Sequence, residues 1–136
     1  MNGEWLNGVT DSKPIIDYRD LDVWNEAMTL AVAIYEETRV FPREEMFGMT
    51  SQLRRAAASV PANIVEGFGR QQTRSFIQFL RIAQGSLKEL ETHVALSVRV
   101  GLMSEAGGMR LAERSDRIGR MLTAFVRALE NKEDGR

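Results

Sequence analysis

The feature that most constrains the fold is a seven-residue repeat of apolar side chains, which recurs in four segments of the chain. Spacings of three and four residues place such side chains on one face of an α-helix. No region alternates apolar and polar residues over more than a few positions, as a half-buried strand would. The pattern therefore predicts four helices, at about residues 20–39, 50–70, 73–100 and 104–130.

Short connections join these segments, which favours an all-α fold, an antiparallel up-and-down four-helix bundle over residues 18–130. A chain of 136 residues with 43% hydrophobic residues can bury one core, and two independent cores are not expected. Residues 1–17 show no helical periodicity, so we expect a flexible N-terminal tail. Residues 131–136 should fray.

The second predicted helix contains a proline near its middle. Pro61 cannot donate a backbone hydrogen bond, and its ring strains the preceding turn. The apolar stripe nevertheless keeps its phase on both sides of the proline, through Leu53, Ala57, Val60, Ile64 and Phe68. We therefore expect one continuous helix that is kinked at Pro61.

The first predicted helix is apolar over about half of its circumference, because it carries two adjacent stripes. The stripe taken as the core face consists of Leu21, Trp24, Met28, Ala31 and Tyr35. The second stripe consists of Val23, Ala27, Leu30 and Ile34. One partner helix would not cover both stripes, so the second is the candidate oligomer interface.

The side chains on which most enzymes depend are scarce. His93 is the only histidine, and there is no cysteine. Di-iron bundles need Glu-x-x-His on each of two helices, whereas here a single Glu89 stands four residues before His93. The Gly-x-Gly of residues 67–69 follows a helix instead of a strand, which excludes a dinucleotide-binding turn. We expect no catalytic residue, no metal site and no cofactor.

The N-terminal residues do not form a basic end followed by an apolar run, and no stretch approaches the length of a membrane span. Together with the lack of cysteine, this predicts a cytoplasmic protein without a membrane partner. The formal net charge is −1, which argues against a general polyanion binder. Residues 49–103, however, hold seven Lys and Arg against three Glu, so an anion-binding surface should lie there.

Polar residues are concentrated in the second and third predicted helices. The candidate polar seam consists of Gln52, Arg54, Arg55, Ser59, Asn63, Glu66, Arg70, Ser86 and Glu89. Folding the two helices back on each other predicts that Arg54 or Arg55 pairs with Glu89 or Glu91. The seam either fixes the register of the helices or forms a rim that binds a partner or an anion. In the fourth helix, by contrast, arginines alternate with acidic residues, as is typical of a solvated face.

Three segments carry a resemblance to a known family: DLDVWNEAM, FPREEMFGMTSQLRRAAASVPANIVEGFGR and FLRIAQGSLKELET. In this order and at these separations they resemble bacterial proteins encoded in intervening sequences of 23S ribosomal RNA. These are also called the S23 family, and the accessory variability proteins of diversity-generating retroelements are related to them. The resemblance implies a four-helix bundle that assembles into a ring-shaped homopentamer, with no established enzymatic activity.

The sequence is compatible with three kinds of function. The first is a non-enzymatic, homo-oligomeric scaffold or adaptor. The second is a binding module for RNA, or for a nucleic-acid-processing protein, that uses the arginines of the second and third helices. A small-molecule or nucleotide-binding enzyme is a distant third.

Overall fold

A computed structural model of the chain describes residues 3–6, 8–9 and 14–135, and this part is helical without any strand. Its helices are α1 (Asp22–Thr38), α2 (Met49–Gly69), α3 (Thr73–Arg99) and α4 (Glu105–Glu133). Short 3-10 turns lie at Glu4–Leu6, Tyr18–Asp20 and Arg43–Glu45. All four predicted helices are confirmed, and their ends agree with the prediction to within three residues.

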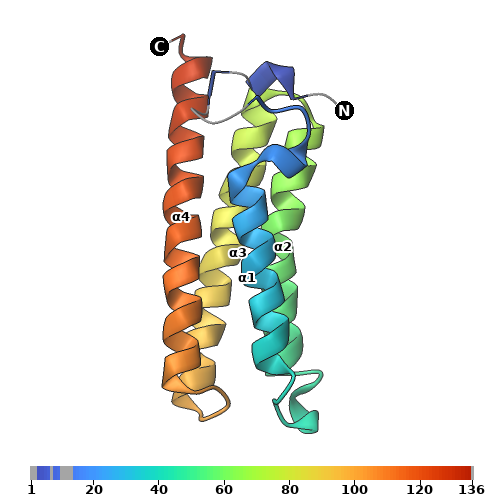
Figure 1. The fold of residues 1–136 in the computed structure, drawn as a ribbon, viewed down its shortest axis with the longest axis vertical. Helices are drawn as coiled ribbons and strands as arrows, with labels where there is room; N and C mark the ends of the chain where they lie inside the picture. Colours follow the sequence, from blue (N-terminus) through green and yellow to red (C-terminus); the bar gives the residue numbers. More distant parts are fainter. Residues whose placement is uncertain (1–2, 7, 10–13, 136) are drawn as a thin grey trace.

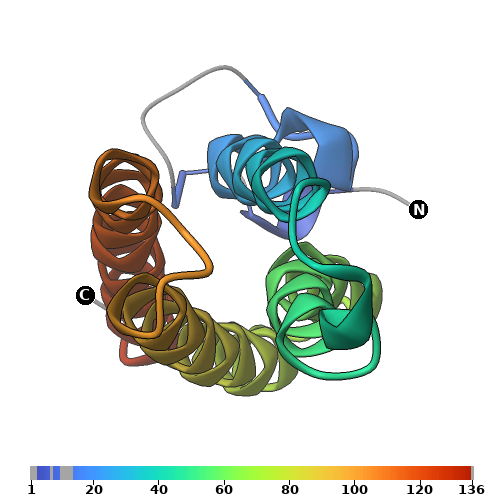
Figure 2. The ribbon, with the colours of Figure 1, turned by 90° about the horizontal axis from the view of Figure 1, so that it is seen from below.

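The four helices run alternately down and up along the long axis of the molecule (Figure 1). Each packs against the next along the chain, and α4 returns to pack against α1. Figure 2 shows this order from the lower end, with the four helices around a common centre. The predicted antiparallel four-helix bundle is therefore confirmed.

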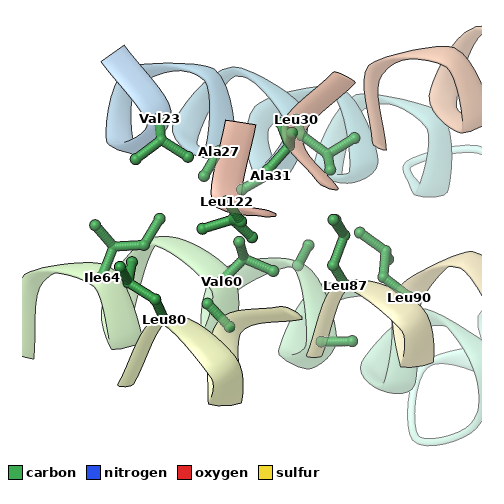
Figure 3. Close-up of a cluster of buried hydrophobic side chains, with 14 of the residues drawn as sticks. Val23, Ala27, Leu30, Ala31, Val60, Ile64, Leu80, Leu87, Leu90 and Leu122 are labelled. Atoms are coloured by element: carbon green, nitrogen blue, oxygen red, sulfur yellow. The ribbon is translucent and has the colours of Figure 1, made fainter. Parts of the chain in front are cut away.

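Apolar side chains from all four helices fill the centre of the bundle (Figure 3). The stripe predicted for α2 is buried, as is the α3 stripe from Phe76 to Val94. Leu111, Ile118, Leu122 and Leu129 complete the core from α4. Burial of these side chains is the main favourable contribution to folding.

Helix α2 continues through Pro61 as a single element, as predicted. The proline is buried, and it also lines the junction between α1 and α2. The pyrrolidine ring of Pro61 thus adds apolar surface to the packing of α1 against α2, which offsets part of the cost of the missing backbone hydrogen bond. The bend expected at this position stays a prediction.

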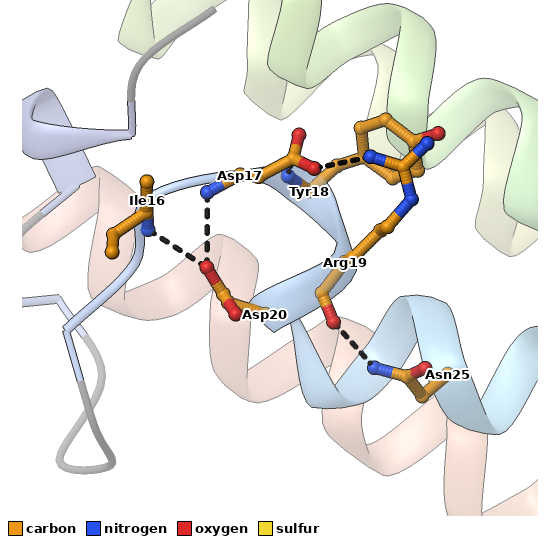
Figure 4. Close-up of polar contacts among 6 residues, drawn as sticks. All are labelled: Ile16, Asp17, Tyr18, Arg19, Asp20 and Asn25. Carbon is orange, nitrogen blue, oxygen red and sulfur yellow. Dashed lines mark hydrogen bonds and ion pairs between the residues drawn. The ribbon is translucent and has the colours of Figure 1, made fainter.

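The chain enters α1 through a tight polar turn (Figure 4). Asp17 accepts a hydrogen bond from the backbone of Tyr18, and Asp20 accepts bonds from the backbones of Ile16 and Asp17. Asn25 then donates to the carbonyl of Arg19 from the first turns of α1. This reciprocal capping closes the 3-10 turn Tyr18–Asp20, and the bond from the Leu21 N–H to the Tyr18 carbonyl leads the chain directly into α1.

Part of the predicted flexible tail is docked on the bundle. Leu6 and Ile15 are buried, and the Trp5 ring lies 6.0 Å from Phe68 and 5.6 Å from Phe76, measured between centroids. Residues 1–2, 7 and 10–13 of that tail lie outside the described residues. The difference from the prediction has a physical cause, since a few large side chains can bury themselves without any periodic pattern.

Candidate functional site

The centre of the predicted polar seam forms at the junction of α2 and α3. The hydroxyls of Ser59 and Ser86 lie 2.8 Å apart across the two helices. Asn63 donates from its amide nitrogen to the Ser59 carbonyl at 2.8 Å and to the Ser59 hydroxyl at 3.0 Å. Three half-buried polar side chains therefore satisfy one another and fix the height of α2 relative to α3.

The outer members of the seam on α2 are solvent-exposed, and their polar contacts run along α2, although the Arg70 guanidinium also lies 5.2 Å from the centroid of the Phe79 ring of α3. Arg55 reaches Gln52 only at 3.5 Å. Arg70 lies 3.4 Å from Glu66, with more than half of each side chain exposed. Such a pair contributes about 0–1 kcal/mol, so this rim adds little to stability.

Arg54 does not belong to the seam, although the sequence placed it there. Its Nε donates to the hydroxyl of Thr38 at 2.9 Å, and its guanidinium lies 4.5 Å from the centroid of the Tyr35 ring. Successive residues of a helix are rotated by about 100°, so Arg54 faces α1 while Arg55 faces solvent on the α3 side. Arg54 thus joins α2 to the end of α1.

The predicted ion pair between Arg54 or Arg55 and Glu89 or Glu91 is wrong. Glu89 lies 3.5 Å from Nε2 of His93, one turn further along α3. Glu91 points towards α4, where it accepts a hydrogen bond of 2.7 Å from the hydroxyl of Ser115. Within the described residues, neither Glu89 nor Glu91 forms an ion pair with an arginine of α2.

The four residues predicted to form an oligomer interface lie in the core instead. Val23, Ala27, Leu30 and Ile34 are all buried, and Figure 3 shows the first three pointing into the apolar cluster. The neighbouring stripe, which the sequence assigned to the core, is buried only at Leu21 and Ala31, whereas Met28 and Tyr35 are 40% and 44% exposed. Val32, one turn after Met28, is 54% exposed beside them.

The exposed side chains Met28, Val32 and Tyr35 form one wall of an open groove between α1 and α2, about 780 Å³ in volume. Its lining is almost entirely apolar and comprises Trp24, Met28, Ala31, Val32, Tyr35, Ala58, Pro61, Ala62 and Val65, with Arg39 and Glu66 as the charged members. We call this surface the α1–α2 groove. Large side chains of α1 form a raised edge of the groove, and small side chains of α2 form its shallow base.

The arginines of α4 are exposed, as predicted for a solvated face, and two of them also form ion pairs with α1. Arg110 pairs with Glu37 of α1 at 3.3 Å, and Arg117 with Glu26 at 3.1 Å. On the other edge, Arg81 and Arg74 of α3 pair with Glu130 and Glu133 at 2.9 Å and 2.8 Å. The spacing of charges along one helix does not identify their ion-pair partners on other helices. Those partners depend on how the helices pack in the bundle.

A second open cavity, about 840 Å³ in volume, lies between α3 and α4 beside Leu90, Val94 and Ala112. Its polar wall contains the Glu91–Ser115 hydrogen bond. Among the described residues, no three His, Asp or Glu side chains gather as a metal site would require. Within the same residues, none of the helices combines the length and apolar character needed to cross a membrane.

Comparisons with known proteins agree with this architecture. Residues 19–124 match the model of a family described as 23S rRNA-intervening sequence protein. One similar solved structure is a protein of unknown function from the S23 ribosomal protein family of Bacteroides thetaiotaomicron VPI-5482. The two share 25% sequence identity with a TM-score of 0.69, over 76% of this chain and 97% of that one. No curated protein matches the chain.

Proposed function

The chain belongs to the family of 23S rRNA-intervening sequence proteins, and from this premise we propose that it is a non-enzymatic scaffold built from several copies of itself. The copies form a ring, and the resemblance implies five of them. A ring of this kind serves as an adaptor that holds partners at fixed positions. The α1–α2 groove is the observation that supports this proposal.

The groove has the properties of a surface that a second protein covers. Three large apolar side chains are between 40% and 54% exposed along one stripe of α1. Isolated exposed apolar residues are ordinary on a soluble protein, but a continuous apolar surface marks an interaction site. A second copy of the chain is the occupant proposed here, because a ring needs a contact surface on every copy.

The chemistry of the polar seam supports a non-enzymatic role. Ser59, Asn63 and Ser86 form hydrogen bonds among themselves, and no acid or base stands within their hydrogen-bonded group. A nucleophilic serine needs such a base at hydrogen-bonding distance. The seam therefore holds α2 and α3 in register.

RNA binding receives less support from the arginines of α2 and α3. Arg54 contacts Thr38 and Tyr35, while Arg74 and Arg81 pair with glutamates of α4. Phosphate contacts would have to compete with these partners. Arg55, which reaches only an amide oxygen at 3.5 Å, is the α2 residue best placed for an RNA contact.

The test measures the mass of the assembly in solution. At micromolar concentration, native mass spectrometry and light scattering should show an oligomer, with five copies per particle. Val32→Asp places a charge in the groove and should raise the dissociation constant by about 30-fold or more. Thr29→Asp is the control, because this exposed residue of α1 lies outside the groove lining.

A monomeric wild-type protein would overturn the scaffold proposal. RNA binding then becomes the better explanation if affinity falls steeply between two salt concentrations, as phosphate contacts require. Arg55→Ala should weaken that binding. Arg54→Ala is less informative in this assay, because it also loosens the contact between α1 and α2.

A further inference from the structure

Gly85 lies in the middle of α3 on an exposed surface, where a glycine has no evident use. A Cβ atom added to this residue would meet no atom within 4 Å among the described residues. Gly67 differs, since a Cβ there would lie 2.5 Å from Cβ of Phe79. An interior glycine destabilises a helix by about 0.8–1.0 kcal/mol relative to alanine. Nothing in the described part of the chain offsets this cost at Gly85.

Gly85 lies at the same height along the bundle as the middle of the α1–α2 groove. The Ser59–Ser86 hydrogen bond brings these two residues to one level. Gly85 and Ala58 are each one residue away from that pair, which is about 1.5 Å along a helix axis. Ala58 lines the groove together with Val32, and Arg54, one turn below Ala58, contacts Tyr35, which lies nearly one turn below Val32. Val32 and Gly85 are therefore level with each other on different faces of the molecule.

The two surfaces also have complementary shapes. Val32 is 54% exposed and projects from the α1 wall of the groove. Gly85 leaves a gap on α3 between Ile82, which is 50% exposed, and the exposed Glu89. A projecting branched side chain opposite a glycine lets two helices approach closely.

The α1–α2 groove and the α3 surface around Gly85 each carry one positive and one negative residue, and the order of the two charges along the bundle axis is reversed between the surfaces. In the groove, Arg39 follows the C-terminal end of α1 and Glu66 lies in the last turn of α2, so the two charges stand at opposite ends, with Arg39 at the lower one. On α3, Glu89 lies one turn below Gly85, and Arg81, which also pairs with Glu130 of α4, lies one turn above it. Two copies that dock in the same direction bring opposite charges together, whereas copies in reversed directions bring like charges together.

Building on the proposed function, we infer that the α1–α2 groove of one copy receives the α3 surface around Gly85 of the next copy. Both copies point in the same direction, so Val32 packs against Gly85, and Arg39 approaches Glu89 of the neighbouring copy. Each copy uses two different surfaces for its two neighbours. Such a head-to-tail contact closes into a ring when the rotation between copies divides a full turn.

Cysteine cross-linking tests this contact directly, because the chain has no cysteine of its own. The double variant Val32→Cys/Gly85→Cys should form disulfides between copies under mild oxidation. A non-reducing gel should then show a ladder that ends at the number of copies in the ring. Each single variant alone should give no more than background dimer.

The control pair is Val32→Cys/Thr123→Cys. Thr123 is exposed on α4 and lies at the height of Gln84, with which it shares a hydrogen bond. Thr123 therefore lies at about the same level along the bundle as Gly85 but on a different face of the molecule. We expect no ladder of cross-linked oligomers from this pair. Gly85→Trp should leave the monomer folded, since the site is open, yet raise the dissociation constant by about 30-fold or more.

The results separate this inference from the proposed function. A wild-type monomer would overturn both. A wild-type oligomer without the Val32–Gly85 ladder, or with a strong dimer from Val32→Cys alone, would overturn only the assigned contact. As an independent check, Arg39→Glu and Glu89→Arg should each weaken assembly by about tenfold, and combining them should restore it.

Discussion

Arg54 and Arg55 are adjacent arginines on α2 with different surroundings. Arg54 is half-buried against α1, where it donates to Thr38 and lies over the ring of Tyr35. Arg55 is exposed, and among the described residues its side chain forms one hydrogen bond, to Gln52 at 3.5 Å. A charge-assisted hydrogen bond contributes about 1.5–3 kcal/mol and an exposed cation–π contact about 0.5–1 kcal/mol. The stability of the bundle should therefore depend on Arg54 and not on Arg55.

We expect Arg54→Ala to lower the free energy of unfolding by about 2 kcal/mol. Arg55→Ala should change it by less than about 0.5 kcal/mol, as is usual for an exposed substitution. Urea denaturation of the two variants at one protein concentration compares them directly. Equal losses would contradict the role assigned to Arg54.

The seam was predicted in part because helical periodicity shows which residues share a face. Ser59, Asn63 and Ser86 meet as that periodicity suggests. The pairing of Arg54 or Arg55 with Glu89 or Glu91 failed for a physical reason. Periodicity gives the angle of each residue around its own helix, but it does not say which neighbouring helix that angle faces.

The same limit explains why the α1 stripe predicted for the oligomer interface is the buried one, while the stripe predicted for the core is partly exposed. Both stripes are apolar, and the sequence shows the width of the apolar arc without its centre. The buried stripe contains Val23, Ala27, Leu30 and Ile34, whereas Met28 and Tyr35 lie towards solvent. Only the positions of α2 and α4 beside α1 decide which edge of the arc stays uncovered.

Two glycines that both lie inside helices should respond in opposite ways to the same substitution. Gly67→Ala should lower the free energy of unfolding by about 2 kcal/mol, because its Cβ would overlap Phe79 and Phe76. Gly85→Ala should raise it by about 0.5–1 kcal/mol, because the added Cβ meets open space. Measurement in a monomeric Val32→Asp background keeps unfolding separate from assembly. A loss at Gly85 in that background would show that the residue has a role within the chain.

The number of helices, their directions and their approximate ends follow from local patterns in the sequence. Apolar periodicity is repeated four times, and short connections leave few ways to pack the segments. The docked N-terminal segment could not be found in this way, because Trp5, Leu6 and Ile15 form no periodic pattern. That segment also precedes residues 19–124, to which the family model matches.

Trp5 should therefore stabilise the upper end of the bundle. We expect Trp5→Ala to lower the free energy of unfolding by about 2 kcal/mol, since it exposes the rings of Phe68 and Phe76. Phe47→Ala is the control, because the Phe47 side chain is 93% exposed. It should change stability by less than about 0.5 kcal/mol, as measured by urea denaturation. Indistinguishable variants would mean that the docked segment contributes nothing to stability.

The contact between Lys132 and the carbonyl of Trp5 brings both ends of the chain to the same end of the bundle (Figure 1). In a ring of copies that all point in one direction, every chain end would lie on one rim. The opposite rim would carry the α1–α2 and α3–α4 connections, with Val40 and Phe47 strongly exposed. Such a ring has two chemically different sides, each repeated once per copy. Weak contacts on either side would add up through multivalency, so the ring could hold one kind of partner above and another below.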